Sequence, residues 1–358
     1  MTQEETHYQS VIDTLIRQNR SFAIYRQPGE QQPHFVMQAS GSACLFNSME
    51  ELNGQSGYVI APFRVTADCP ILLIRPDITE LQSAKTSDDG TTSLEEIDET
   101  ETTPYADAFA RFIRPVKEGR FRKLVLSRKL TIKRTEGFSP AEAFFTASER
   151  YTRSYVYLCH TPIAGTWLGG TPEILLSGEA GRWQTVALAG TQPLAADEIL
   201  PTEWDTKNRE EQRLVASYIE EQLATLGIRP TREGPYTVRA AALAHLRSDF
   251  HFALPDNRTL GDVLALLHPT PAVCGLPKEE AYHFITRHEG YDRRYYSGFI
   301  GQLEPEGRTD LYVNLRCMCI GQRQLTLYAG GGLLASSTLN AEWQETEYKM
   351  QTMLGITQ

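Results

Sequence analysis

The sequence predicts an α+β fold in which antiparallel strands are interrupted by inserted helices. Short segments of alternating apolar and polar residues, typical of half-buried strands, recur along the chain. Segments with helical periodicity interrupt them at irregular intervals, whereas a parallel α/β fold would repeat one strand and one helix regularly. The chain has 358 residues, of which 41% are hydrophobic and 22% are charged, so it can bury a large core.

The N-terminal part is predicted to be rich in strands. An amphipathic helix is expected over residues 8–20. Strands are expected at residues 22–27, 34–39, 57–63 and 69–75. Residues 86–104 are acidic and rich in Ser and Thr, which predicts a flexible connector. We expect a single domain over residues 1–358, in which residues 1–85 add strands to the larger part at residues 105–358.

The larger part mixes helices and strands. Helices are expected at residues 103–119, 140–151, 205–227, 260–267 and 340–354. Strands are expected at residues 123–132, 154–160, 166–179, 297–304, 309–320 and 324–331. The helix that begins near Asp205 has this residue as its candidate N-cap and Gly227 as its closing glycine. Pro269 and Pro271 stop the helix that precedes them.

The composition excludes some classes of protein. A net charge of -10 argues against nucleic acid as a partner, because phosphate binding needs basic patches. An anionic ligand would therefore need local cations, backbone N–H groups or a metal ion. No apolar run approaches the ~18 residues of a membrane span, and the first residues lack the features of a signal peptide. Six scattered cysteines without a C-x-x-C pair indicate reduced thiols, so we expect a cytoplasmic protein.

Two residues are candidates for acid–base chemistry. Lys123 begins an apolar strand, where it is either an exposed lysine or a base desolvated in a cleft. Glu173 follows a Gly-Gly-Thr-Pro turn and enters an apolar strand. It is either a solvated strand-edge residue or a buried carboxyl whose pKa is raised, as general-acid catalysis requires.

Acidic residues on two predicted helices are candidate metal ligands. Glu211 lies one helical turn before Val215 and so flanks the apolar face, whereas Glu210 is expected to face water. On the last helix Glu342, Glu345 and Lys349 share a face, and a Glu–Lys pair with the spacing of Glu345 and Lys349 is usual for a surface ion pair. The alternative is a site for Mg²⁺, which takes only one or two protein carboxylates with waters and substrate oxygens.

Other residues are candidates for binding an anion. Gly330, Gly331 and Gly332 are expected in a turn whose N–H groups could hold a carboxylate. Arg316 lies between apolar neighbours in a predicted strand, and a buried arginine is usually paired with an anion. His268 ends a helix, where a capping or core histidine is the simpler interpretation. Taken together, these residues describe a site for a dianion bound through Mg²⁺.

Nine motifs occur in the order found in the chorismate-utilising enzymes, and the sequence resembles this family over residues 105–357. They are KLVLSR, GGTPEILL, ALAGT, KNREEQRLV, LLHPTPAVCG, YDRRYYSGFIG, NLRC, AGGGLL and AEWQETEYK. The resemblance implies the family's fold, with large layered antiparallel sheets and helices on the outside, and makes residues 105–358 the chorismate-binding catalytic part.

The resemblance also implies roles for single residues. Glu173 corresponds to the general acid that protonates the departing C4 hydroxyl, and Glu211 and Glu345 correspond to the Mg²⁺ ligands. The remaining correspondences are to substrate-binding positions: Gly190 and Thr191 of ALAGT, His268 near the ring, and Arg316, Gly331, Gly332 and Lys349 at the carboxylates.

Two positions indicate a branch of the family. Lys123 corresponds to the lysine with which isochorismate and salicylate synthases activate water. Ala189 stands where aminodeoxychorismate synthases carry a nucleophilic lysine. The resemblance therefore implies an isochorismate synthase that adds water at C2, with no glutaminase subunit. The alternatives are a salicylate synthase, which also eliminates pyruvate, and a non-catalytic chorismate-binding protein.

Some positions depart from the family pattern. Gln192 follows AGT where relatives often have an arginine-containing turn, Gln212 stands in place of a common histidine, and Asn208 stands where some relatives have an acid. These departures concern the surroundings of the expected metal site. The resemblance is compatible with either menaquinone or siderophore biosynthesis, and relatives of this kind are often monomeric.

Overall fold

The computed structural model describes residues 3–39, 42–84, 104–194, 200–240, 243–254 and 256–357. The connector predicted at residues 86–104 lies, apart from Pro104, outside the described residues. Among the described residues, no helix is both long and apolar enough to cross a membrane. The six cysteines are free, and all but Cys44 are buried.

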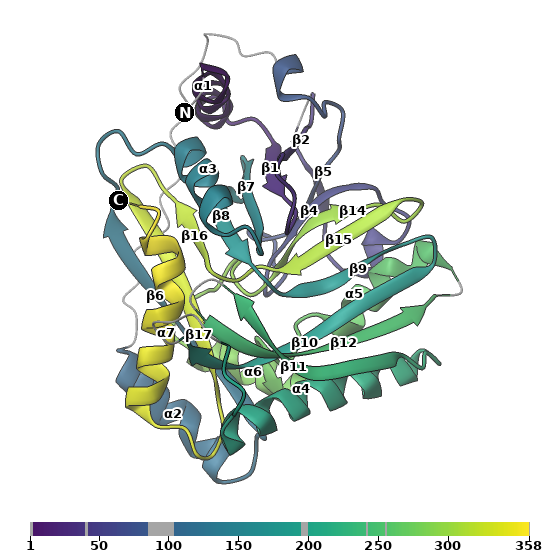
Figure 1. Cartoon of the computed structure of the whole chain (residues 1–358), viewed down its shortest axis with the longest axis vertical. Helices are drawn as coiled ribbons and strands as arrows, with labels where there is room; N and C mark the ends of the chain where they lie inside the picture. The colour runs from purple at the N-terminus through teal and green to yellow at the C-terminus, as the bar shows by residue number, and fades with distance from the viewer. Residues whose placement is uncertain are drawn as a thin grey trace.

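The described strands form two antiparallel sheets, which agrees with the predicted α+β class (Figure 1). The first sheet has the order β13 (Gly275–Leu276), β6 (Lys123–Lys133), β17 (Gln324–Leu333), β16 (Cys317–Ile320), β8 (Gly165–Thr171), β7 (Tyr155–Thr161), β1 (Phe22–Arg26) and β2 (His34–Met37). The second has the order β11 (Thr231–Ala240), β12 (Leu243–Ala253), β10 (Arg182–Pro193), β9 (Ile174–Glu179), β15 (Arg308–Val313), β14 (Phe299–Leu303), β4 (Gly57–Ala61), β5 (Ile71–Ile74) and β3 (Cys44–Phe46).

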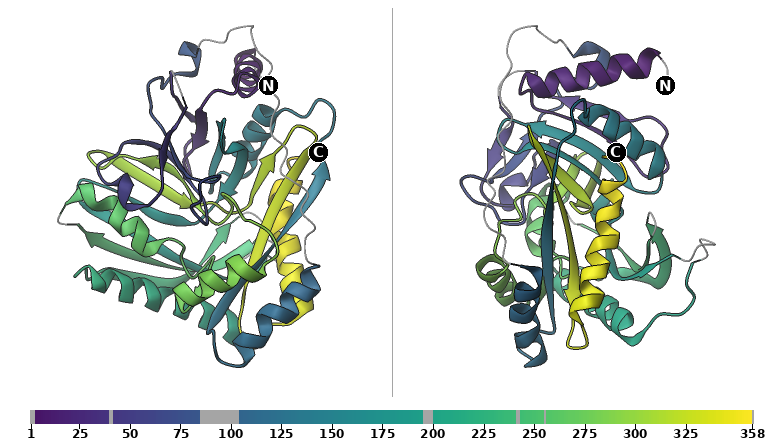
Figure 2. Two further views of the ribbon diagram at one scale, coloured as in Figure 1. Left: turned by 180° about the vertical axis from the view of Figure 1, so that it is seen from behind. Right: turned by 90° about the vertical axis from the view of Figure 1, so that its left-hand side faces the viewer.

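Helices surround the two sheets (Figures 1 and 2). They are α1 (Gln3–Arg17), α2 (Tyr105–Lys117), α3 (Pro140–Arg150), α4 (Thr206–Thr225), α5 (Leu260–Leu267), α6 (Lys278–His288) and α7 (Leu339–Leu354), with short 3₁₀ turns η1 (Glu50–Leu52), η2 (Leu81–Ser83) and η3 (Asn257–Thr259). The C-terminal α7 packs along β17, and α4 packs along β10 and β12. As predicted, Asp205 caps α4, because its carboxylate accepts a hydrogen bond from the backbone N–H of Asn208 (2.7 Å).

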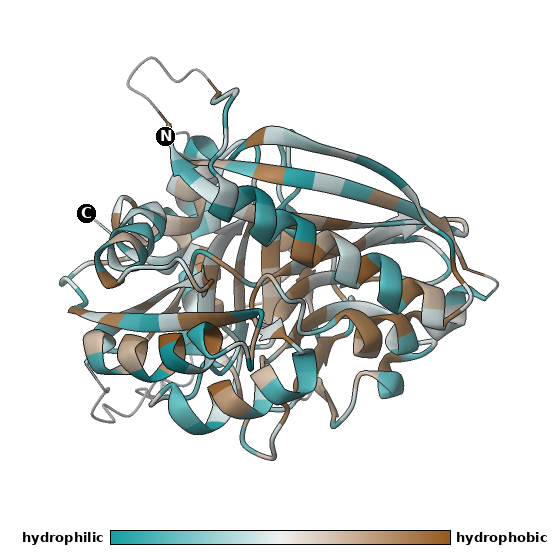
Figure 3. Cartoon of the chain, turned by 90° about the horizontal axis from the view of Figure 1, so that it is seen from below, coloured by the Kyte–Doolittle hydropathy of each residue, from teal (hydrophilic) through white to brown (hydrophobic). Residues whose placement is uncertain are grey.

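An aromatic core lies between the sheets. Tyr155 of the first sheet stacks on Tyr312 of the second, with ring centroids 4.2 Å apart. The Tyr155 hydroxyl also donates to that of Tyr58, so the contact is both apolar and hydrogen-bonded (3.0 Å). Figure 3 shows hydrophobic residues concentrated on the inner strands and a mixture of both kinds along the helices. This packing holds the two sheets in a fixed relation at the site described below.

The strand predicted at residues 309–320 is in fact two strands. β15 ends at Val313 in the second sheet, and β16 begins at Cys317 in the first. The chain crosses from one sheet to the other at residues 314–316, where Arg316 has a φ of 47°. Alternation alone could not reveal this crossing, because the apolar pattern continues on both sides of it.

Candidate functional site

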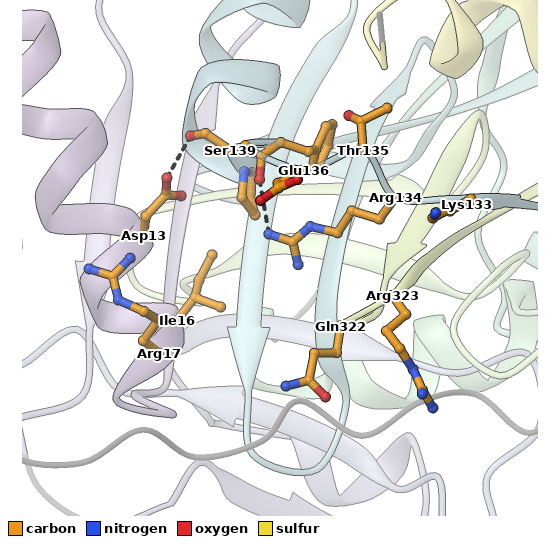
Figure 4. A pocket seen from close by; sticks show the side chains of 13 residues that line it. Asp13, Ile16, Arg17, Lys133, Arg134, Thr135, Glu136, Ser139, Gln322 and Arg323 are labelled. Atoms are coloured by element: carbon orange, nitrogen blue, oxygen red, sulfur yellow. Dashed lines mark hydrogen bonds between the residues drawn. The ribbon is translucent and has the colours of Figure 1, made fainter.

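A cavity of about 1000 Å³ near the N-terminal helix is not the candidate site. It lies between α1, the loop that joins β6 to α3, and the turn between β16 and β17 (Figure 4). Its central polar groups hold the surrounding chain together. Asp13 accepts a hydrogen bond from the hydroxyl of Ser139 (2.6 Å), and Arg134 donates to the carbonyl of Phe138 (2.9 Å). These are structural contacts between a helix and the adjacent loop.

A smaller, buried cavity of about 70 Å³ lies where the two sheets meet. Strands β6 and β17 of the first sheet, β10 and β12 of the second, and helices α4 and α7 contribute to its walls. The predicted residues that line it are Glu173, Gly190, Thr191, Glu211, Arg316, Gly331, Gly332 and Lys349. Since a water molecule needs about 10–15 Å³, the cavity holds a few waters, and a larger ligand requires the lining side chains to move.

Three glutamates beside the cavity each pair with a lysine. The pairs are Glu211 with Lys123 (2.9 Å), Glu342 with Lys207 (2.6 Å) and Glu345 with Lys349 (2.7 Å). We call these six residues the glutamate–lysine cluster. Helix α4 contributes Lys207 and Glu211, and Glu210 is exposed as predicted. Lys123 is fully buried at the start of β6, so the alternative of an exposed lysine is wrong.

The strand predicted at residues 324–331 is confirmed and extends to Leu333, so the three consecutive glycines next to this cluster lie within a strand and do not form the turn that was also expected for them. Gly330, Gly331 and Gly332 belong to β17 and pair with β6. A Cβ at Gly332 would lie 2.2 Å from Glu211 Oε1, and one at Gly331 would lie 3.0 Å from Glu342 Oε2. The glycines are therefore required because carboxylates occupy the space of their missing side chains.

Glu173 is a buried acid. It is 3% exposed, and burial raises the pKa of its carboxyl to about 8, although Lys123, Lys349 and Arg316 oppose the shift. At pH 7 the carboxyl is therefore largely protonated. The raised pKa agrees with the sequence-based expectation for this residue.

The glutamate–lysine cluster fits a hard cation. Burial raises the pKa of Glu211, but the positive charges of Lys123 and Lys207 lower it by more, so the pKa of Glu211 lies below its usual value. Burial and the nearby Glu345 raise the pKa of Glu342. The buried Glu342 Oε2 has no hydrogen-bond partner among the described residues. Carboxylate oxygens are the ligands that Mg²⁺ prefers.

No three His, Cys, Asp or Glu side chains of the described residues already surround one metal position. The fit to Mg²⁺ therefore rests on the type of ligand and on the unpartnered oxygen of Glu342. Glu211, Glu342 and Glu345 are the residues that could hold the ion. The sequence analysis assigned the first and the last of these and did not assign Glu342.

Arg316 reaches the cavity together with a histidine that the sequence analysis did not identify. Arg316 donates from its guanidinium to Nε2 of His245 (2.5 Å), and Nδ1 of His245 lies 2.9 Å from the carbonyl oxygen of Gly190. Burial, with the charges of Arg316 and Lys349, lowers the pKa of His245 well below its usual value. The neutral ring therefore donates from Nδ1 to Gly190 and accepts from Arg316 at Nε2.

Arg316 itself remains charged at neutral pH. Burial lowers its pKa to about 10, and the nearby Glu173 opposes the shift. Lys349 adds a second positive charge at the cavity wall and donates to the carbonyl of Gly330 (2.8 Å). These two residues give the acidic protein a local positive site for an anion.

His268 does not line the cavity. Its Nε2 lies 3.1 Å from the carbonyl oxygen of Pro62, and its ring packs edge-on against Phe299. Burial and the charge of Lys278 lower its pKa to about 3. His268 is therefore a neutral core histidine, and the histidine at the cavity is His245. No strand was predicted around His245, so no pattern pointed its side chain toward the site.

The comparisons with known proteins agree with this geometry. The family model described as "Chorismate binding enzyme" matches residues 65–358. The isochorismate synthase EntC of Escherichia coli (strain K12) is 32% identical over 209 residues, which cover 56% of this chain and 54% of that protein. The isochorismate synthase DhbC of Bacillus subtilis (strain 168) is 30% identical over 274 residues, which cover 71% of this chain and 67% of that protein.

A solved structure extends the likeness to the fold. The structure of MenF, the menaquinone-specific isochorismate synthase from Escherichia coli, has a TM-score of 0.76 at 22% identity and covers 97% of this chain and 91% of that one. The chain thus has the layered fold that the motifs predicted. The aligned segment spans about half of EntC and two thirds of DhbC. Because the family model matches most of the sequence, this chain belongs to the family of chorismate-binding enzymes.

Proposed function

We propose that this protein converts chorismate into isochorismate by adding water at C2 of the ring and removing the hydroxyl group at C4. One observation carries the proposal: Glu173 is buried and largely protonated, and Lys123 exerts the largest electrostatic effect on it. A buried acid at the cavity and a buried lysine close enough to influence its pKa suit a reaction that needs an acid and a base. The relatives named as isochorismate synthases support the same activity.

The proposed reaction has two proton transfers, one from a water molecule to Lys123 and one from Glu173 to the leaving oxygen. Lys123, after it has given up the proton of its ion pair with Glu211, takes a proton from the water molecule whose oxygen bonds to C2. Both double bonds of the ring shift, from C1=C2 to C1=C6 and from C5=C6 to C4=C5, and the bond between C4 and its hydroxyl oxygen breaks. Glu173 donates its proton to this oxygen, which leaves as water. The raised pKa of Glu173 supports this role, because an ionised carboxylate could not donate.

The carboxylates of chorismate need positive partners. Arg316 and Lys349 are the cations at the cavity wall, and the backbone of Gly331 and Gly332 lines the cavity beside them. Gly190 and Thr191 line the opposite part of the wall on β10. We assign to His245 the place beside the substrate that the resemblance had given to His268.

Glu211, Glu342 and Glu345 would hold Mg²⁺, which would supply positive charge for a substrate carboxylate in addition to the charges of the lysines that already pair with these glutamates. The residues of the chain then orient the ring between Lys123 and Glu173. Glu345→Gln is expected to weaken the Mg²⁺ dependence of turnover, and full Mg²⁺-dependent activity in this variant would reject Glu345 as a ligand.

The test is an NMR product assay on chorismate with and without Mg²⁺. Isochorismate without pyruvate is expected, and only when Mg²⁺ is present. Salicylate with stoichiometric pyruvate would instead indicate a salicylate synthase. Glu173→Gln and Lys123→Ala should each abolish turnover while the far-UV spectrum stays unchanged, and near-normal activity in either variant would reject its role.

A further inference from the structure

One edge of β10 lacks a neighbouring strand next to the cavity. β10 pairs with β12 from Arg182 to Pro193, whereas its pairing with β9 ends at Gln184. Beyond Gln184, helix α4 packs against β10. A buried N–H or C=O group left unpaired costs about 1–3 kcal/mol, so this edge needs partners of another kind.

Gln212 of α4 supplies two of these partners. Its Oε1 accepts a hydrogen bond from the N–H of Ala189 (3.0 Å), and its Nε2 donates to the carbonyl of Ala187 (3.0 Å). Nε2 also donates to the hydroxyl of Ser248 on β12 (3.2 Å). One side-chain amide thus bonds an N–H and a C=O of β10 as a peptide group of an adjacent strand would.

Asn208 continues the pattern one helical turn earlier. Its Oδ1 accepts from the N–H of Thr191 (2.9 Å), and its Nδ2 donates to the Asp205 carboxylate, which fixes the orientation of the amide (3.0 Å). Between the two anchored N–H groups, β10 bulges at Gly190, which has a φ of 76°. A Cβ at Gly190 would lie 3.2 Å from Cβ of Asn208, so the bulge packs directly on the helix.

The anchored bulge is connected to the cavity. The carbonyl oxygen of Gly190 accepts from Nδ1 of His245, which leaves Nε2 of that ring to accept from Arg316. The position of Gly190 thus determines where the histidine ring lies and which nitrogen it presents. A shift of the bulge would change the orientation of the guanidinium.

We propose that Asn208 and Gln212 are positioning residues: their side-chain amides replace a neighbouring strand along β10 and hold Gly190 and His245 so that Arg316 faces a substrate carboxylate. This inference rests on the proposed function, because it takes chorismate as the ligand. The amide is the suitable group, since it both donates and accepts, whereas a carboxylate only accepts and a hydrocarbon does neither.

The test compares Gln212→Met and Asn208→Ala with the unaltered protein. Gln222→Met, on the same helix, is the matched control. Both positioning variants are expected to raise KM for chorismate by about tenfold and to lower kcat by less than about threefold. The reason is that they displace the arginine that binds the substrate carboxylate and leave Lys123 and Glu173 unchanged. NMR hydrogen exchange at Ala189 should accelerate in Gln212→Met and at Thr191 in Asn208→Ala, but at neither position in the control.

The possible outcomes distinguish failure of the positioning proposal from failure of the proposed function. Faster exchange with an unchanged KM would overturn the proposal, because the contacts would then be purely structural. A raised KM without faster exchange would overturn it as well. If Gln212→Met does not fold, Asn208→Ala decides, since that side chain lies in the first turn of α4. Absence of turnover in the unaltered protein would reject the proposed function itself, while the exchange measurement would still test the hydrogen bonds.

Discussion

Glu173 acquires its chemistry from its surroundings. The carboxyl is buried beside an apolar strand, and three positive charges nearby do not compensate for the lost hydration. A glutamate in solvent would be ionised at neutral pH and could not donate a proton. The expected Gly-Gly-Thr-Pro turn is in fact the end of β8, and Glu173 lies in the short crossing from β8 of the first sheet to β9 of the second. This crossing matters because it places the side chain in the interior between the sheets.

The activity is expected to fall as the pH rises above about 8, the pKa of Glu173. The protonated form of Glu173 is the proton donor in the proposed reaction, so its contribution to kcat/KM should decrease about tenfold per pH unit above this pH. The pH profile of kcat/KM checks this expectation.

Lys278, whose pKa burial also lowers to about 8, provides the control. It donates to the carbonyls of Leu266 and His268, away from the cavity. Lys278→Arg keeps a donor but does not titrate in this range, so the decrease should remain. Loss of the high-pH decrease in Lys278→Arg would show that Lys278, and not Glu173, causes the decrease.

Single residues were predictable where a local pattern placed them. Glu211 was assigned to the inner edge of its helix from its spacing to Val215, and the structure places it at the cavity. His245 and Glu342 were missed for different reasons. The strand that carries His245 was not predicted, and the partner of Glu342 is Lys207, which is distant in the sequence. Contacts between distant segments leave no periodic pattern.

At the scale of elements, β17 and the helices beside it form one unit. The glycines of β17 make room for carboxylates from α4 and α7, so strand and helices can approach closely. Neither a GGG sequence nor a pair of glutamates on a helix indicates this arrangement alone. The sequence predicted the helices from their caps and periodicity, but it predicted a turn where the glycines continue the strand.

Gly332→Ala tests this unit. The added Cβ would meet Glu211 Oε1 at 2.2 Å and Lys123 Cε at 2.6 Å, so the ion pair must move. We expect kcat/KM to fall by at least about 100-fold, which corresponds to about 3 kcal/mol. Gly170→Ala on β8 is the control, because its Cβ would find ordinary contacts from 3.6 Å outward. Equal activities of the two variants would contradict the close packing.

At the scale of the whole molecule, the site depends on the junction of the two sheets. Asn314 lies fully buried at this junction. Its Oδ1 accepts from the hydroxyl of Tyr157 on the first sheet (2.6 Å), and its Nδ2 donates to the carbonyl of Tyr295 (2.9 Å). The side-chain amide of Asn314 thus links Tyr157 to the backbone of Tyr295, which lies more than a hundred residues further along the chain.

Asn314→Ala should lower the free energy of unfolding by about 2–4 kcal/mol, because it leaves two buried polar groups without partners. Urea denaturation measures the change. The exposed Asn340→Ala serves as the control and should change stability by less than about 0.5 kcal/mol. A similarly small effect of Asn314→Ala would show that the junction does not rely on this amide.

The fold class followed from the sequence, but the pairing of the strands did not. β1 pairs with β7, and β4 with β14, so N-terminal strands complete sheets built by residues far along the chain. The apolar alternation that identifies a strand is the same for any neighbour. Only the resemblance to a family pointed to the layered sheets, because it draws on the whole order of motifs.

The crossing between the sheets has a further consequence, which concerns stability. Arg316 occupies a backbone conformation that costs a non-glycine residue about 1–2 kcal/mol, and its lowered pKa means that the fold holds this charge at a disadvantage. Arg316→Gly relieves this backbone cost but leaves the buried Nε2 of His245 without its donor, so the two effects are expected to offset each other, and the free energy of unfolding is expected to change by less than about 2 kcal/mol. A loss of more than about 2 kcal/mol would contradict this expectation.

Stability alone would thus give little reason to keep Arg316. Strained residues at functional sites commonly lower stability in exchange for activity. A programme that stabilises this protein by substituting its strained positions would reach Arg316 early, and under the proposed function the resulting protein would no longer bind chorismate.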